Sequence, residues 1–398
     1  MLLLSLGALA VLCAVERFPM ADVLVYRAEG AAVAHGADLY GFTVTAWNLP
    51  ATYPPFAALL FAPTALLSPA ATKVAFLAGN SALLVLLVQL SLRLTHLPRT
   101  GRTPGLRGRL PVLFAATAAG VWLEPVYQTI IFGQINLLLA CLVLWDLGRP
   151  EGARGKGLAV GIAAGIKLTP AIFAVYLLLT GRVRAAGLAL AGFAGTVVLG
   201  ALVLPTASLE FWTRRIFETT RVGKPWIVDN QSIQGLAARI AHTPDPGVLW
   251  LLPAAVVTVA GLMLARQLYL RHGLDGWGLL VTALTALLVS PISWSHHWVW
   301  CVPLLVLLAS RRPGAAFFVY VVFTARTLWM VPRTGPLDLQ QPWWVQPLTS
   351  PYPLLAFALL AGVAARCYSL SESVPFSGLR TASGSGSAVS RSWESTIR

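Results

Sequence analysis

Residues 73–110 read KVAFLAGNSALLVLLVQLSLRLTHLPRTGRTPGLRGRL. The apolar run over residues 73–94 carries charge only at Lys73 and Arg93, and it is long enough to cross a bilayer, which takes about 20 residues. The connector that follows is rich in arginine, and basic connectors of membrane proteins stay in the cytoplasm. The stretch therefore predicts a membrane-spanning helix that ends inside, which places residues 22–69 on the outer face.

The composition of the whole chain also indicates a membrane protein. Of its 398 residues, 57% are hydrophobic and 11% are charged, and the mean hydropathy is +0.72, which leaves too little polar surface for a water-soluble fold. The net charge of +14 lies mostly in short connectors, so it predicts orientation in a lipid bilayer rather than binding to nucleic acid. The cysteines stand singly in or beside apolar runs, so we expect core residues without disulfides: Cys13, Cys141, Cys301 and Cys367.

The pattern of apolar runs and basic connectors repeats along the chain. Residues 157–180 have basic flanks at both ends, so two half-spans that turn at Lys167 fit the charge rule better than one crossing. The sequence thus predicts an all-α, polytopic transmembrane bundle of roughly twelve helices, with both termini cytoplasmic and interfacial helices in the outer loops. Further spans are expected near residues 110–123, 135–147, 185–204, 248–268, 277–291, 298–310, 314–331 and 351–366.

Met1–Val15 is short for a span, and we interpret it as an uncleaved first helix of the bundle, either with Glu16 and Arg17 reaching the interface or with a truncated start. Two other segments are not expected to span. Residues 56–67 follow two prolines and fit a helix at the outer interface. Residues 369–398 are rich in Ser and Gly and are predicted to be a disordered cytoplasmic tail. Residues 1–368 would then form a single domain.

The first outer loop gathers carboxylates. Asp22 follows the first helix, and Glu29, Asp38 and Tyr40 come after it. A carboxylate at a partly dehydrated interface suits a general base, because burial raises its proton affinity towards the working pH. The alternative is that Asp22 caps the following helix while Glu29 and Asp38 are solvated.

Two polar positions fall beside or inside apolar runs. Gln134 and Asn136 stand at an outer helix start, where they could bind a ligand or, as we prefer for Asn136, join helices by hydrogen bonds. Lys167 lies within an apolar run, where an ammonium group is costly unless a phosphate or a paired carboxylate meets it. Gly157, Gly161 and Gly165 recur every four residues, which predicts close helix packing.

Two later outer segments add polar groups. In residues 205–246, Arg214 and Arg215 follow aromatic residues, which suits either lipid headgroups or an anionic glycolipid. The triplet Asn230, Gln231 and Ser232 offers neutral groups of the kind that bind sugar hydroxyls. His296 and His297 are adjacent, so their side chains diverge, which makes them a poor metal-chelating pair and a better hydrogen-bonding or phosphate-binding pair. We predict no metal site.

Several of these stretches together resemble one family. DVLVYRAEG, DLYG, YPPF, FGQINLLL, GIKLTP, NQSIQG and SPISWSHHW occur in this order, and they resemble the polyprenyl-phosphate-mannose-dependent mannosyltransferases of glycosyltransferase family 87. The resemblance implies the GT-C architecture, an extracytoplasmic active site and an inverting reaction. It also implies that Asp22 is the catalytic aspartate, and that Lys167, Asn230–Ser232 and one of His296 and His297 belong to the site.

The chemistry of the residues agrees with a lipid-phosphate donor. The sequence has no D-x-D motif and no phosphate-binding Walker loop, so a nucleotide sugar held through a metal is not supported, and we expect no cofactor. Polyprenyl phosphate leaves already ionised, so one base on the acceptor hydroxyl suffices. We therefore predict transfer of a mannosyl residue from polyprenyl phosphate to a glycolipid or glycan acceptor at the extracytoplasmic face of the cell membrane. A non-enzymatic lipid-glycan transporter is the alternative, which the absence of a matching polar cluster in the inner connectors disfavours.

Overall fold

The computed structural model describes residues 1–15, 20–95, 106–332 and 336–372. These residues form 18 α-helices joined by short 3-10 turns. The strands in this part of the chain are β1 (Thr43–Val44) and β2 (Leu49–Pro50), which pair antiparallel in a small ribbon. The predicted all-α class is confirmed, and the four cysteines are free, as expected.

Four helices of the described chain are long and apolar enough to cross a membrane: α4 (Pro69–Leu94), α10 (Val183–Val203), α13 (Val248–Leu270) and α18 (Pro351–Glu372). A fifth candidate is the pair α5 (Leu106–Gly120) and α6 (Glu124–Phe132), which is bent by 75°. The prediction of roughly twelve helices is therefore not confirmed as a count of spans.

Several expected spans are real helices but short ones. They are α7 (Asn136–Leu147), α14 (Asp275–Val289), α15 (Cys301–Ala309) and α16 (Pro313–Thr324). At 1.5 Å per residue, a helix of about 12 residues covers roughly 18 Å of a hydrocarbon core that is about 30 Å thick. The first residues of the span expected at 298–310 belong to the 3-10 turn η5 (Ser295–Trp300) instead. Such irregular backbone is tolerated at membrane depth where protein surrounds it.

The break predicted at Lys167 is confirmed, because residues 157–180 form two short helices, α8 (Leu158–Ile166) and α9 (Ile172–Leu179), on either side of it. Gly157 lies against Ala185 and Gly165 against Thr196, so α8 runs parallel to α10. Helix α9 then returns to the beginning of α10, where the Arg182 amide donates to the Leu177 carbonyl. The segment therefore enters and leaves at the same end of the bundle.

The glycine repeat sets the distance between α8 and α10. A Cβ atom built on Gly161 would overlap with the backbone carbonyl of Ala189, and one on Gly157 would overlap with that of Ala185. The α8–α10 pair has the most extensive contact between any two helices described. Close packing, as predicted from the sequence, is thus the role of these glycines.

We expect Gly161→Ala to lower the free energy of unfolding by about 1–3 kcal/mol, because the added methyl forces α8 and α10 apart. Gly195→Ala in α10 is the matched control, since a Cβ there meets no neighbouring atom within 4 Å and alanine favours a helix. Thermal unfolding of the two variants in detergent compares them. Equal midpoints would show that the glycine repeat does not limit the packing.

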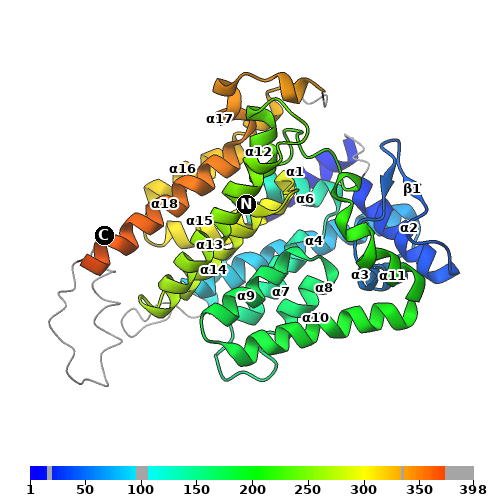
Figure 1. The fold of residues 1–398 in the computed structure, drawn as a ribbon, viewed down its shortest axis with the longest axis horizontal. Helices are drawn as coiled ribbons and strands as arrows, with labels where there is room; N and C mark the ends of the chain where they lie inside the picture. The colour runs from blue at the N-terminus through cyan, green and yellow to red at the C-terminus, as the bar shows by residue number, and fades with distance from the viewer. Residues whose placement is uncertain (16–19, 96–105, 333–335, 373–398) are drawn as a thin grey trace.

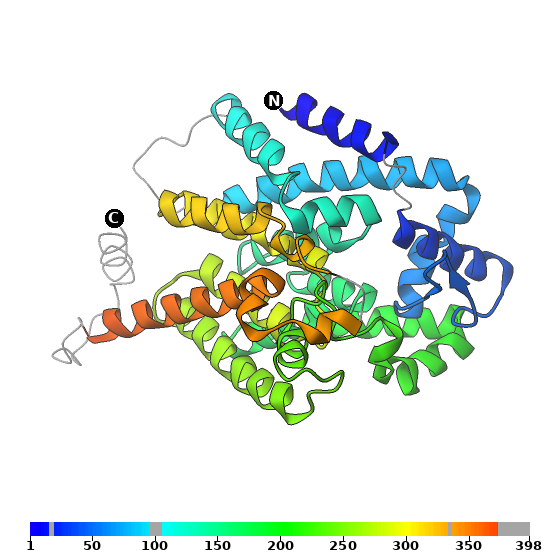
Figure 2. The same ribbon diagram turned by 90° about the horizontal axis from the view of Figure 1, so that it is seen from above.

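One end of the bundle carries several short elements of the first outer segment and of the segment after α10 (Figure 1). Helices α2 (Ala21–His35), α3 (Pro55–Phe61) and α11 (Pro205–Thr213) gather there with the β ribbon, and the C-terminal end of α18 lies at the opposite end (Figure 1). Helices α1 (Leu2–Val15) and α5 run along one edge beside α4 (Figure 2). The cavity described below opens among the elements of the first end.

The remaining segment predictions concern the short helix at residues 56–67 and the C-terminal tail. The expected short helix after the prolines is present as α3 and the 3-10 turn η1 (Ala62–Leu66). Helix α18 continues to Glu372, which is beyond the domain boundary predicted at residue 368. The rest of the expected tail, residues 373–398, lies outside the described residues.

Candidate active site

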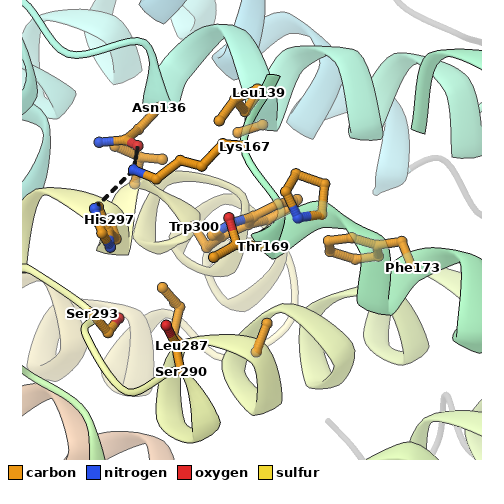
Figure 3. A pocket seen from close by; sticks show the side chains of 14 residues that line it. Asn136, Leu139, Lys167, Thr169, Phe173, Leu287, Ser290, Ser293, His297 and Trp300 are labelled. Atoms are coloured by element: carbon orange, nitrogen blue, oxygen red, sulfur yellow. Dashed lines mark hydrogen bonds between the residues drawn. The ribbon is translucent and has the colours of Figure 1, made fainter. Parts of the chain in front are cut away.

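A cavity of about 260 Å³ brings together residues from distant parts of the sequence. Asp22, Gln134, Lys167 and His297 all lie on its wall, and Arg215 lies there too. A smaller cavity of about 50 Å³ shares Lys167 and His297 with it. The walls of the smaller cavity are otherwise mostly apolar, with Leu139, Phe173, Leu287 and Trp300 among them (Figure 3). The site is thus a wide polar chamber with a narrow apolar extension.

Asp22 is held at the start of α2. The N-cap of this helix is Met20, in a left-handed conformation and without a side-chain cap, so Asp22 lies in the first turn and is not the capping residue. Gly133 packs against Val23, and a Cβ on Gly133 would overlap with the Val23 side chain. This contact brings Gln134 next to Asp22.

The surroundings of Asp22 tune it as a base. Burial raises the pKa of its carboxyl group to about 6, although a hydrogen bond from Gln134 and the positive charge of Lys167 act to lower it. A base with a pKa near the working pH is ionised and still takes up a proton readily. Asp22 is therefore suited to accept the proton of a hydroxyl group.

A pair of tyrosines orients Gln134. Its Oε1 atom accepts hydrogen bonds from the hydroxyls of Tyr26 at 2.9 Å and Tyr53 at 3.1 Å. The carbonyl side of the amide is thereby occupied, so its NH₂ side donates to Asp22. Tyr26 and Tyr53 were not among the site residues predicted from the sequence, although both lie in stretches that carry the family resemblance, DVLVYRAEG and YPPF.

Lys167 and His297 form the second functional group. The Lys167 ammonium donates to Nε2 of His297 at 2.9 Å and to Oδ1 of Asn136 at 3.2 Å (Figure 3). Among the described residues, no carboxylate forms an ion pair with Lys167, which argues against the internal pair left open from the sequence. The arrangement instead leaves a positive charge available to a phosphate on the cavity wall.

The two histidines have different roles, because their side chains diverge as expected. His297 lines both cavities. His296 lines neither, and its ring packs edge-on against Phe132, with the centroids 5.6 Å apart. Its backbone carbonyl accepts hydrogen bonds from Thr129 and Asn136. The predicted phosphate contact of His296 is therefore corrected to a structural position.

Asn230, Gln231 and Ser232 are fully buried and do not line the cavity. The Asn230 side chain accepts from the Ser293 amide at 2.8 Å and donates to the Pro291 carbonyl at 3.0 Å. Gln231 donates to the Thr349 carbonyl, and Ser232 caps α12 (Ile233–Ile240). The prediction of direct sugar binding is corrected, because these polar groups bond to the protein itself, and Asn230 holds Pro291 and Ser293, which line the cavities, from behind.

The remaining predicted residues divide between the wall and the layer behind it. Arg215 lines the cavity, whereas Arg214 does not and pairs with Glu218 in solvent, so its predicted substrate contact is corrected. Tyr40 also stands behind the wall, where its hydroxyl donates to the Tyr53 carbonyl at 2.9 Å. Arg221 lines the cavity and was not selected from the sequence. Within the described residues, no group of three or more His, Cys, Asp or Glu side chains is placed to hold a metal ion.

Comparison with known proteins indicates one family of glycosyltransferases. The sequence model of glycosyltransferase family 87 matches residues 51–291. A Mycobacterium tuberculosis protein (strain ATCC 25618 / H37Rv) is 36% identical over 310 residues, 74% of this chain and 72% of that protein. It is named polyprenol-phosphate-mannose-dependent alpha-(1-2)-phosphatidylinositol mannoside mannosyltransferase.

A second relative, from M. tuberculosis (strain CDC 1551 / Oshkosh), is 34% identical over 86% of this chain and 81% of its own length. Its name gives a phosphatidylinositol pentamannoside as the mannosyl acceptor. A Mycolicibacterium smegmatis protein with the same name as the first relative is 35% identical over 74% of this chain and 72% of its own length. No solved structure matches.

Proposed function

The chain belongs to glycosyltransferase family 87, and on this premise we propose how its cavity transfers a mannosyl residue from a polyprenyl phosphate to a hydroxyl of an envelope glycolipid or glycan. The enzyme is a polyprenyl-phosphate-mannose-dependent mannosyltransferase. The observation that carries the proposed mechanism is the convergence of Asp22, Lys167 and His297 on one cavity.

Asp22 acts as the general base. It takes the proton of the acceptor hydroxyl while the hydroxyl oxygen bonds to the anomeric carbon of the donor and the bond from that carbon to the phosphate oxygen breaks. Attack from the face opposite the phosphate inverts the anomeric centre. The leaving phosphate is already ionised and requires no acid, whereas a glycosidase requires a matched pair of carboxyl groups.

Lys167 and His297 hold the departing phosphate. Negative charge accumulates there as the bond breaks, and a cation with a directed hydrogen-bond donor stabilises that charge. The apolar extension begins at these two residues and leads between Leu139, Phe173 and Leu287. We assign it to the first isoprenyl units of the donor, so the lipid points into the bundle and the mannosyl group into the wide chamber.

The proposal includes the orientation of the protein. The chamber opens at the extracytoplasmic face of the cell membrane in a GT-C architecture, and both termini are cytoplasmic. The support is that the C-terminal end of α18 lies at the end of the bundle opposite α2 and α11 (Figure 1), and that basic residues stand near the ends of α13 and α18, Arg271 and Arg366. Basic residues of short connectors favour the cytoplasmic side.

The test is donor turnover by purified protein in detergent with labelled polyprenyl phosphate mannose and a mannoside acceptor. We expect the label to move to the acceptor and polyprenyl phosphate to be released. A transporter would leave the bond between mannose and phosphate intact. Release of label without a mannosylated product, or no release at all, would contradict the proposed reaction.

The pH dependence of the reaction follows from Asp22. The base acts only when it is deprotonated, and its pKa is raised to about 6, so we expect kcat/KM to fall about tenfold for each pH unit below that value. Gln134→Leu removes a hydrogen bond that lowers this pKa, which should move the acid limb to higher pH. A pH–rate profile of each protein measures the shift. An acid limb that stays in place in the variant would contradict the role of Gln134.

A further inference from the structure

We propose that Arg221, together with Arg215, forms a second anion-binding subsite in the wide cavity, and that it binds the phosphodiester group of a glycolipid acceptor. The inference rests on the proposed function and deepens it, because it names an anionic class of acceptor. It starts from two arginines that share the cavity wall with Asp22.

The subsite is separate from the position of the donor phosphate. Arg221 donates to the Ala51 carbonyl at 2.6 Å and lies over the ring of Tyr40, 5.4 Å from its centroid. Lys167 contacts Asn136, His297 and the ring of Tyr53 instead. The cavity therefore presents two cationic positions with different neighbours, and the reaction uses only one of them for the leaving group.

Positive charge exceeds negative charge around Arg221. Glu218 is shared among Arg214, Arg215 and Arg221, with nitrogen–oxygen distances of 2.8, 2.9 and 3.7 Å. The other carboxylate in the group, Glu210, pairs with Arg215 at 2.6 Å. Three guanidinium groups thus face two carboxylates, which leaves one positive charge for an incoming anion.

Arg221 also has hydrogen-bonding capacity to spare. Its Nε atom is buried and has no hydrogen-bond partner, and the shared Glu218 oxygen lies too far away for a hydrogen bond. Burial and the neighbouring cation of Arg215 lower the pKa of Arg221. A bound anion would offset both the burial of the guanidinium group and its repulsion from Arg215, because a guanidinium group forms two parallel hydrogen bonds to the oxygens of a phosphate.

Glu29 is the nearby carboxyl group that could have neutralised Arg221. It is buried in α2, and burial raises its pKa to about 8, against the smaller opposing effect of Arg221. At neutral pH it is therefore mostly protonated and does not supply the missing negative charge. The subsite remains electropositive.

The position of the subsite selects the acceptor rather than the donor as the source of the anion. The acceptor hydroxyl must reach Asp22, and the donor phosphate is at Lys167 and His297. An anion at Arg221 belongs to the molecule that enters the wide chamber, with its sugar between the reacting hydroxyl and its own phosphate. Anionic lipids of the surrounding bilayer offer the same chemistry, so the experiment has to distinguish the two sources.

The experiment compares Arg221→Gln with wild type in vesicles of zwitterionic phosphatidylcholine that contain no anionic lipid besides the donor and the acceptor. Two acceptors are used, a phosphatidylinositol mannoside and a neutral alkyl mannoside. We expect the ratio of kcat/KM for the phosphorylated acceptor to that for the neutral one to fall about 10- to 100-fold, the usual effect of losing a charge-assisted hydrogen bond. Taking the ratio cancels any loss of folded protein.

Lys224→Gln is the matched control, because Lys224 is an exposed cation of the same loop that does not line the cavity. Its ratio should equal that of wild type. An unchanged ratio in Arg221→Gln overturns the subsite. If adding phosphatidylglycerol to the vesicles changes wild-type rates equally with both acceptors but leaves Arg221→Gln unaffected, the ligand is a bilayer headgroup, which overturns the assignment to the acceptor.

The same experiment distinguishes failure of the proposed function from failure of the anion subsite. If wild-type protein transfers mannose to neither acceptor, the mannosyltransferase mechanism itself fails. If wild type transfers to both acceptors and the variant keeps the same selectivity, only the anion subsite fails.

Discussion

We expect Asp22→Asn to lower turnover by about 10²- to 10⁴-fold, the usual contribution of a positioned general base. The substitution keeps the shape of the side chain but removes the charge that accepts the proton. The new side-chain amide also faces the NH₂ group of Gln134, because the carbonyl oxygen of Gln134 already accepts hydrogen bonds from Tyr26 and Tyr53. Transfer of labelled mannose by purified variant and wild type measures the effect.

The prediction for Asp22 has a matched control in the same outer segment. Asp38 is exposed, and its carboxylate accepts a hydrogen bond from the Tyr40 amide at 2.9 Å rather than lining the cavity. Asp38→Asn should retain nearly full turnover. If Asp22→Asn also retains it, Asp22 is not the base and the mechanism needs another proton acceptor. A thermal unfolding curve confirms that both variants are folded.

The sequence predicted the chemical centre of the site better than its surroundings. Asp22, Gln134 and Lys167 each pair a polar group with an apolar setting, which is costly unless the group has a function or a partner. The structure places all three on one cavity wall. Asn230 was predicted for its hydrogen-bonding groups in an outer loop, yet its side chain bonds to Pro291 and Ser293 and does not line the cavity, because composition does not reveal whether a polar side chain faces a cavity or a neighbouring carbonyl.

Helix lengths were the less predictable part of the fold. Hydropathy is summed over a window of residues, so it predicts one continuous helix even where tertiary contacts stabilise a break. The buried carboxylate of Glu124 accepts hydrogen bonds from Ser295 at 2.8 Å and from Tyr352 at 2.6 Å. These bonds tie the turn η5 to α6 and α18, and they connect residues far apart in the sequence. Arg221 was not predicted as a site residue for a related reason, since only the fold brings it from a long loop to the cavity.

The role of Lys167 leads to the second large effect. We expect Lys167→Met to lower kcat by about 10²- to 10³-fold, because a preorganised cation at the leaving group stabilises charge that develops in the transition state. Methionine keeps a similar length and remains compatible with the apolar extension. The same substitution leaves Nε2 of His297 and Oδ1 of Asn136 without their shared donor.

A second readout separates electrostatics from a loss of packing at Lys167. The charge of Lys167 lowers the pKa of Asp22, so the acid limb of the pH–rate profile should move to higher pH in Lys167→Met, a shift that a purely steric defect does not produce. Lys224→Met is the control, since Lys224 is exposed and lies outside the cavity wall. A variant with wild-type kcat and an unmoved acid limb would remove Lys167 from the mechanism. A lower kcat with an unmoved limb would mean that the ammonium group does not act on Asp22 across the cavity.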